Sequence, residues 1–225
     1  MEIRLRLMNN KLPFYHLIRK SNLKNGKSPL ILMIHGYGSN EQDLFSFSRA
    51  IPENFTIISL RGDIEFQYNE YAWYNIFWDY NGVKSYDIEK AKKSRDNILK
   101  SLDICKDLYE IDPDNITLMG FSQGAMLVNA VALTYPEKIN NIISLSGAFD
   151  PYIINLSNSK YLKKLSFYIS HGLNDEILPF DFSKKSLKIL DDNNLNYIFE
   201  EYPIGHTVSP DNFKSMLNWL IEKTN

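Results

Sequence analysis

Apolar positions along the chain fall into short runs separated by longer amphipathic stretches. Residues 29–36 are almost continuously apolar, as in a strand that is buried on both faces of a sheet. Residues 3–7 alternate between charged and aliphatic side chains, and residues 13–20 follow as a second short strand, which predicts an antiparallel opening pair. Five more strands are predicted at residues 55–60, 115–120, 139–147, 165–172 and 195–202.

The clearest helical pattern spans residues 88–109. Its apolar residues recur at spacings of three, four or seven, and lysines occupy the other faces. Strands that alternate with such helices predict an α/β fold, with a mostly parallel, doubly wound sheet and helices on both faces. At 225 residues, the chain fits a single domain over residues 1–225.

Residues 62–86 follow neither the helical nor the strand period, and they concentrate aromatic side chains. A long irregular segment favours either a loop that covers its own aromatic residues or a lid or pocket wall beside a functional site. Exposed aromatic residues would equally serve as the surface of a homodimer. Between residues 66 and 80, these aromatic residues are Phe66, Tyr68, Tyr71, Trp73, Tyr74, Phe77, Trp78 and Tyr80.

Composition and charge narrow the class of protein. A hydrophobic content of 44% is typical of globular proteins, and a net charge of −2 gives no reason to expect nucleic acid or an anionic membrane as a partner. The first residues lack the apolar core of a signal peptide, and no apolar run approaches the length of a membrane span, so no stable membrane association is expected. Cys105 is the single cysteine, which favours a reducing compartment and a cytoplasmic location.

A serine between two glycines stands where a predicted strand changes into a predicted helix. The segment GFSQG, residues 120–124, follows a β-prone run and precedes a dense apolar run. A helix-capping serine would not need glycine on both sides. A sharp strand-to-helix turn does need both, because Cβ atoms there would collide with neighbouring backbone. The pattern therefore predicts a nucleophile elbow with Ser122 as the nucleophile.

A serine nucleophile needs a general base, and the base needs an orienting carboxylate. His206 is the predicted base, because it follows the last strand at the edge where reactive groups gather in parallel sheets. Asp175 is the favoured acid, because its loop follows the strand immediately before the one that leads to His206. Asp150 is the alternative, and Glu176 is a weaker one. The remaining histidines are expected to pack in the core or to hold loops: His16, His35 and His171.

Acyl chemistry also needs N–H donors that face the developing oxyanion. The amide of Gln123, at the start of the helix after the elbow, is one candidate. The segment HGYGSN, residues 35–40, contains two glycines that let backbone approach a substrate closely. The amide of Tyr37 in this segment is the second candidate.

Five segments together resemble the phospholipase/carboxylesterase family of α/β-hydrolases, which includes the acyl-protein thioesterases. The resemblance implies that Ser122 is the nucleophile, Asp175 the triad acid and His206 the base, with the Tyr37 and Gln123 amides as oxyanion donors. It implies no cofactor and no metal. The segments are HGYGSNEQDL at 35–44, SLRG at 59–62 with YAWYNI at 71–76, GFSQGA at 120–125, HGLNDEILP at 171–179 and GH at 205–206.

From these residues we expect a serine hydrolase that forms an acyl-enzyme on Ser122. Its expected partners are small-molecule carboxylic esters or thioesters, as for a carboxylesterase, lysophospholipase or thioesterase. Trp73, Tyr74, Phe77 and Trp78 are expected to line the acyl side of the site. The alternatives are a ligand-binding protein on a hydrolase scaffold and an acyltransferase that uses the same triad.

Overall fold

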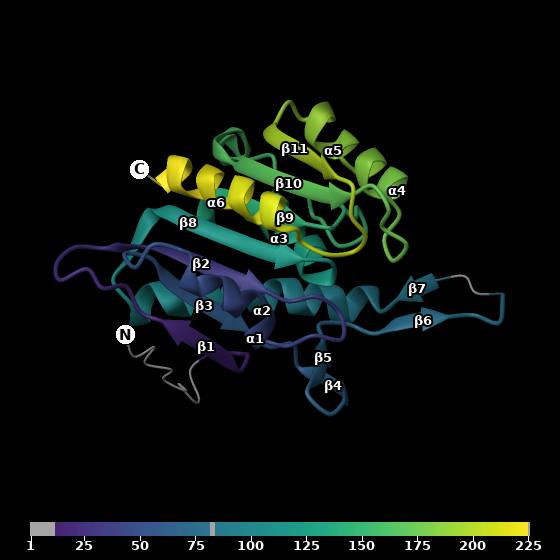
Figure 1. Ribbon diagram of the computed structural model, residues 1–225, viewed down its shortest axis with the longest axis horizontal. Coiled ribbons are helices and arrows are strands. Elements are labelled where there is room, and N and C mark those ends of the chain that lie inside the picture. The colour runs from purple at the N-terminus through teal and green to yellow at the C-terminus, as the bar shows by residue number, and fades with distance from the viewer. Residues whose placement is uncertain (1–11, 82–83, 225) are drawn as a thin grey trace.

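The structure is a computed structural model and describes residues 12–81 and 84–224. Among these residues, the central sheet has seven strands in the order β1-β3-β2-β8-β9-β10-β11 (Figure 1). β1 runs antiparallel to β3, and the other neighbouring pairs are parallel. The strands are β1 (His16–Arg19), β2 (Ser28–Ile34), β3 (Thr56–Leu60), β8 (Ile111–Phe121), β9 (Asn141–Leu145), β10 (Ser166–Gly172) and β11 (Asn196–Tyr202).

The predicted α/β-hydrolase architecture is confirmed, with an antiparallel pair at the edge of the sheet. β1 runs antiparallel to β3, with His16 opposite Leu60. The predicted pairing with residues 3–7 stays a prediction, because residues 3–7 lie outside the described residues. Pairing with β1 gives hydrogen-bond partners to the edge of β3, which would otherwise present a row of unpaired backbone groups.

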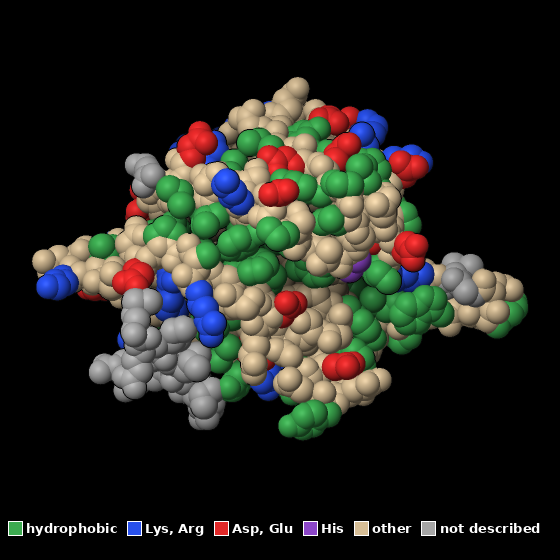
Figure 2. All heavy atoms as spheres, in the orientation of Figure 1, with side chains coloured by type: hydrophobic (Ala, Val, Ile, Leu, Met, Phe, Trp, Pro, Cys, Tyr) green, Lys and Arg blue, Asp and Glu red, His purple; other side chains and the backbone are tan. Residues whose placement is uncertain are grey.

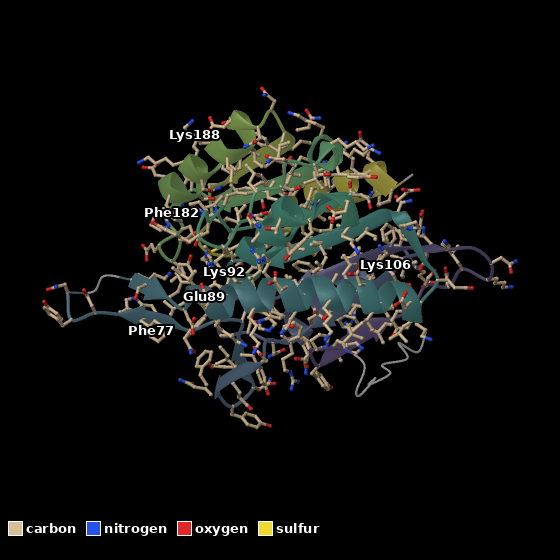
Figure 3. All side chains as sticks on the ribbon, turned by 180° about the vertical axis from the view of Figure 1, so that it is seen from behind. Phe77, Glu89, Lys92, Lys106, Phe182 and Lys188 are labelled. Carbon is tan, nitrogen blue, oxygen red and sulfur yellow. The ribbon has the colours of Figure 1, made fainter. Side chains whose placement is uncertain are left out.

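Helices cover both faces of the sheet because its strands bury side chains on both faces. Along β2, Leu30, Leu32 and Ile34 join one core cluster with α2 and α3, whereas Ile31 and Met33 join a second cluster with α1 and α6. This alternation is the two-residue period of a strand. Figure 1 shows α6 on the near face, and Figure 3 shows α2 on the opposite face.

None of the described helices is long and apolar enough to cross a membrane. The α-helices are α1 (Gln42–Phe45), α2 (Ile88–Leu108), α3 (Gln123–Thr134), α4 (Phe180–Ser186), α5 (Lys188–Asp192) and α6 (Pro210–Thr224).

Residues 62–86 contain two short hairpins, so the expectation of an irregular segment was wrong. β4 (Ile64–Gln67) pairs with β5 (Glu70–Ala72), and β6 (Ile76–Trp78) pairs with β7 (Lys84–Tyr86). Both hairpins project from the body of the molecule (Figure 1). Their strands are three or four residues long and largely exposed, so they carry too few buried positions for a period to be visible in the sequence.

Candidate active site

Ser122 lies in a sharp turn between β8 and α3, with a φ of 53° and a ψ of −116°. A positive φ is uncommon for a residue other than glycine and marks a strained position. The flanking glycines make room for the turn. A Cβ atom at Gly120 would lie 2.4 Å from the carbonyl oxygen of Gly124, and a Cβ atom at Gly124 would lie 2.0 Å from that of Ile34. The strained turn is therefore the backbone geometry that the G-x-S-x-G pattern predicts.

Side chains from three strand ends meet at this turn. His206 Nε2 lies 2.8 Å from Ser122 Oγ, and His206 Nδ1 lies 2.6 Å from Asp175 Oδ2. A carboxylate only accepts hydrogen bonds, so Nδ1 carries the proton and Nε2 presents its lone pair to the serine hydroxyl. Ser122 is 84 residues from His206 in the sequence, and Asp175 is 31 residues from it, so the fold alone joins them.

The loops that carry the aspartate and the histidine are held together by their backbones. They follow the adjacent parallel strands β10 and β11. The amide of Asn174 donates to the carbonyl oxygen of Ile204 at 3.0 Å. Contact is so close that a Cβ atom at Gly172 would lie 2.2 Å from the carbonyl oxygen of Gly205. This packing holds the Asp175 loop against the His206 loop.

The carboxylate of Asp175 is oriented by its own loop. Its Oδ1 accepts hydrogen bonds from the amides of Ile177 at 2.9 Å and Leu178 at 2.8 Å. These two bonds leave Oδ2 directed toward His206. Asp175 is buried, whereas the imidazole of His206 is 15% exposed, so the serine–histidine end of the chain of hydrogen bonds is the end that solvent reaches.

The two other carboxylates considered from the sequence are placed differently. Asp150 is buried and accepts a hydrogen bond from the hydroxyl of Tyr86. Its other oxygen accepts the amide of Tyr152 at 2.9 Å. Glu176 is exposed. Within the described residues, Asp175 is the one of the three that bonds to His206.

The glycine-rich segment after β2 packs directly against the serine turn. A Cβ atom at Gly36 would lie 3.1 Å from the Phe121 ring and 3.3 Å from Ser122 Cβ. The amide of Tyr37 makes no hydrogen bond to any residue that the structure describes. Gln123 is the first residue of α3, and first-turn amides have no partner within their helix. Both amides expected to bind an oxyanion thus belong to segments that adjoin Ser122.

His35 holds this segment in place through both ring nitrogens. Nδ1 donates to the carbonyl oxygen of Gly36 at 2.7 Å, and Nε2 accepts the amide of Gly62 at 3.0 Å. Burial lowers the pKa of His35 to about 4, so the ring is neutral at pH 7 and one nitrogen remains an acceptor. The expected loop-holding role matches these contacts.

The sequence matches a known family over nearly its whole length. A profile of the family described as Phospholipase/Carboxylesterase matches residues 20–224. The chain belongs to this family. The prediction made from the five sequence segments is confirmed, and the family is one of carboxylic ester hydrolases.

Two named relatives and one solved structure are similar to this chain. Acyl-protein thioesterase 1 of Aspergillus fumigatus is 32% identical over 151 residues, which is 60% of this chain and 61% of that protein, under two thirds of its length. Acyl-protein thioesterase 1 of Emericella nidulans is 27% identical over 217 residues, 84% of this chain and 88% of that protein. A crystal structure of a carboxylesterase from Mesorhizobium loti shares the fold, with a TM-score of 0.81 at 18% identity over 96% of this chain and 98% of that one.

The four aromatic residues expected to bind substrate form two pairs. Trp73 and Tyr74 are 0% and 2% exposed and lie in the core between the two hairpins. Phe77 and Trp78 are 50% and 59% exposed on β6, and Figure 3 shows Phe77 on the projecting hairpin. Figure 2 shows hydrophobic side chains gathered where this hairpin leaves the body. Contact of the four residues with a substrate stays a prediction.

The sequence predicts a role for the amide of Gln123 but none for its side chain. Oε1 accepts the amide of Trp73 at 3.0 Å, and Nε2 donates to the carbonyl oxygen of Tyr74 at 2.8 Å. The side chain thus fastens the segment between the hairpins to the first residue of α3. Nothing in the sequence signals this contact, because the partners are backbone groups about 50 residues away.

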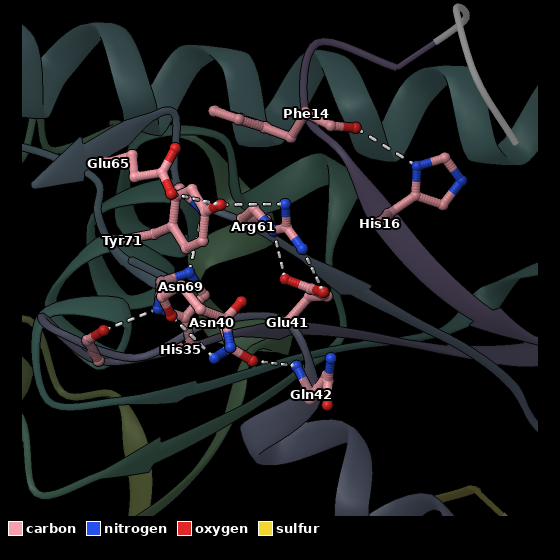
Figure 4. Close-up of polar contacts among 12 residues, drawn as sticks. Phe14, His16, His35, Asn40, Glu41, Gln42, Arg61, Glu65, Asn69 and Tyr71 are labelled. Carbon is pink, nitrogen blue, oxygen red and sulfur yellow. Dashed lines mark hydrogen bonds and ion pairs between the residues drawn. The ribbon is translucent and has the colours of Figure 1, made fainter. Parts of the chain in front are cut away.

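An ion pair fixes the other side of the glycine-rich segment. Arg61 donates to both oxygens of Glu41, at 2.5 Å from Nε and 2.7 Å from Nη2 (Figure 4). Its guanidinium also lies over the rings of Tyr15, 4.2 Å away, and Tyr71, 4.5 Å away. The hydrogen bonds that Arg61 donates to Glu41 raise the pKa of Arg61 above its ordinary value. The pair ties the segment after β2 to the end of β3.

In the part of the chain that is described, no group of three or more His, Cys, Asp or Glu is arranged to hold a metal ion.

Proposed function

We propose that this protein is a serine hydrolase that cleaves carboxylic esters or thioesters through an acyl-enzyme on Ser122. The observation that carries the proposal is the continuous chain of hydrogen bonds from Ser122 Oγ through His206 to Asp175, which begins at a strained elbow. The family description Phospholipase/Carboxylesterase supports carboxylic esters as substrates, and relatives named acyl-protein thioesterase support thioesters. The substrate is a small-molecule acyl ester or thioester, and the proposed location is the cytoplasm.

The first step is attack of Ser122 Oγ on the carbonyl carbon. His206 Nε2, at 2.8 Å, takes the hydroxyl proton, and Asp175 stabilises the imidazolium through the bond to Nδ1. The amides of Tyr37 and Gln123 donate to the oxyanion of the tetrahedral intermediate. The imidazolium then gives its proton to the leaving alcohol or thiol.

The second step frees the enzyme. Water enters the position of the leaving group, and His206 takes a proton from it as it attacks the acyl-enzyme carbonyl. Collapse of the second tetrahedral intermediate breaks the bond to Ser122 Oγ, which takes the proton back from His206. The 15% exposure of the imidazole is compatible with this entry of water, because the ring is reached from solvent.

The test is hydrolysis of p-nitrophenyl esters of increasing acyl length by the wild type and by Ser122→Ala. The expected loss of kcat in the variant is on the order of 10⁶-fold, as for removal of a triad serine. A fluorophosphonate should label the wild type but not Ser122→Ala. Ser46→Ala is the matched control and should still be labelled, because it removes an exposed serine at the end of α1 in place of the proposed nucleophile. Full activity of Ser122→Ala would refute the proposal. Labelling without turnover would favour transfer of the acyl group to an acceptor other than water.

A further inference from the structure

A second histidine lies against the carboxylate that the proposed mechanism uses. His171, near the end of β10, is 1% exposed, and its Nε2 is 3.2 Å from Asp175 Oδ2. The same nitrogen is 2.8 Å from the carbonyl oxygen of Leu178. A carbonyl oxygen accepts and does not donate, so Nε2 carries the proton and points it at the loop that contains Asp175.

The contacts of His171 form a clamp on the turn from residue 175 to residue 178. Leu178 donates its amide to Asp175 Oδ1 at 2.8 Å and accepts the His171 proton on its carbonyl oxygen at 2.8 Å. His171 therefore binds Leu178, and the amide of Leu178 binds Asp175 Oδ1. The Nε2–H group of His171 also lies beside Asp175 Oδ2. Both oxygens of the carboxylate are fixed relative to β10, and this fixes the direction in which Oδ2 meets His206.

The other ring nitrogen of His171, Nδ1, indicates that the imidazole acts through Nε2 alone. Burial lowers the pKa of His171, so the ring is neutral at pH 7 and Nδ1 is an acceptor. This atom is buried and has no hydrogen-bond partner among the residues that the structure describes. An unpaired buried polar atom destabilises the folded state. An apolar side chain of similar size would avoid that cost but would lose the Nε2 proton.

We infer that His171 is a positioning residue for catalysis, whose Nε2–H holds the Asp175 turn so that the carboxylate is aligned with His206. The inference rests on the proposed function, because it assigns a role relative to the same triad. The inference predicts that kcat depends on an N–H donor at position 171 and does not depend on the imidazole ring itself. Glutamine places an amide N–H at a similar distance from the backbone as Nε2, whereas phenylalanine fills the space without a donor.

The test compares His171→Phe, His171→Gln and the matched control His16→Phe. His16 is also a buried histidine with an unpartnered ring nitrogen within the described residues, and its hydrogen bond is to Phe14, outside the site. With p-nitrophenyl esters, His171→Phe should lower kcat by about 100-fold with KM little changed, as for a misplacement of a catalytic group by about 1 Å. The kcat of His171→Gln should stay within about fivefold of the wild-type kcat, because the glutamine amide supplies an N–H donor. A fivefold change corresponds to about 1 kcal/mol in activation free energy. His16→Phe should keep the wild-type kcat.

A second readout does not depend on turnover. The proton between His206 Nδ1 and Asp175 should give a far-downfield proton NMR signal in the wild type, in His171→Gln and in His16→Phe. It should be lost or shifted in His171→Phe. A folded His171→Phe variant with wild-type kcat and an unchanged signal would overturn the inference. If that variant does not fold, His171→Gln decides: a wild-type kcat and signal support the inference, and a 100-fold loss overturns it. Absence of ester turnover and of fluorophosphonate labelling in the wild type would refute the proposed function, while the NMR comparison would still test the clamp.

Discussion

Replacement of Gly124 by alanine tests whether the elbow depends on the missing side chain. The added Cβ atom would lie 2.0 Å from the carbonyl oxygen of Ile34 and 2.6 Å from that of His35. Cβ atoms essentially never approach other heavy atoms within 3.0 Å, so α3 and β2 must separate by about 1 Å. The obstacle is backbone in the middle of the sheet, which has little freedom to move.

The expected loss of stability follows from two opposing effects. Overpacking by one carbon costs about 1–3 kcal/mol, and the rigid neighbours place this site near the upper end. Alanine is favoured over glycine in a helix by about 1 kcal/mol, which offsets part of the loss. The net destabilisation is therefore about 2 kcal/mol. For a chain of this length, it corresponds to a Tm lower by about 4–8 °C.

The assay is thermal unfolding beside kcat on a p-nitrophenyl ester. Gly205→Ala is the matched control for stability, because the nearest atom to its Cβ would be Asn174 O at 3.7 Å, an ordinary contact. Its free energy of unfolding should change by no more than about 0.5 kcal/mol. In Gly124→Ala, displacement of the Gln123 amide from the segment after β2 should also lower kcat by about 100-fold. A Gly124→Ala variant whose Tm is within about 2 °C of the Gly205→Ala variant would show that the close contact is not what requires glycine.

Two further predictions concern buried polar groups. Tyr86→Phe removes the hydroxyl that donates to buried Asp150 and should lower the free energy of unfolding in urea by about 1–3 kcal/mol. Tyr80→Phe, at a tyrosine that is 97% exposed, should change it by less than about 0.5 kcal/mol, and equal effects would contradict the assigned role of the Tyr86 hydroxyl. Because burial lowers the pKa of His35 from 6.5 to about 4, the unfolded chain binds a proton first as the pH falls, so the free energy of unfolding should decrease between pH 6.5 and 4 by up to about 3 kcal/mol. This pH dependence should be shallower in His35→Gln, and a slope as steep as that of the wild type would exclude His35 as its source.

Local sequence patterns determined the strands, the helices and the elbow. Side chains along β2 join the two core clusters alternately, and buried positions recur along α2 at helical spacing, because each element has its own period and the apolar residues of the sequence follow that period. The glycines at 120 and 124 specify the turn for an equally local reason, since each is needed where a Cβ atom would strike backbone. The α/β-hydrolase fold and the family were accordingly predictable. The hairpins of residues 62–86 were not, because strands of three or four residues have too few buried positions to show a period.

Only the tertiary structure decided which polar groups meet. Asp175 and Asp150 both follow parallel strands, and the sequence could favour one only by strand order. In the folded chain, Asp175 reaches His206 while Asp150 binds Tyr86. The clamp from His171 to the Asp175 turn was likewise absent from any sequence pattern. The physical reason is that a hydrogen bond requires partners within about 3 Å in a set direction. Such an alignment depends on strand order, loop path and side-chain packing together, whereas hydrophobic burial depends mainly on position along one element.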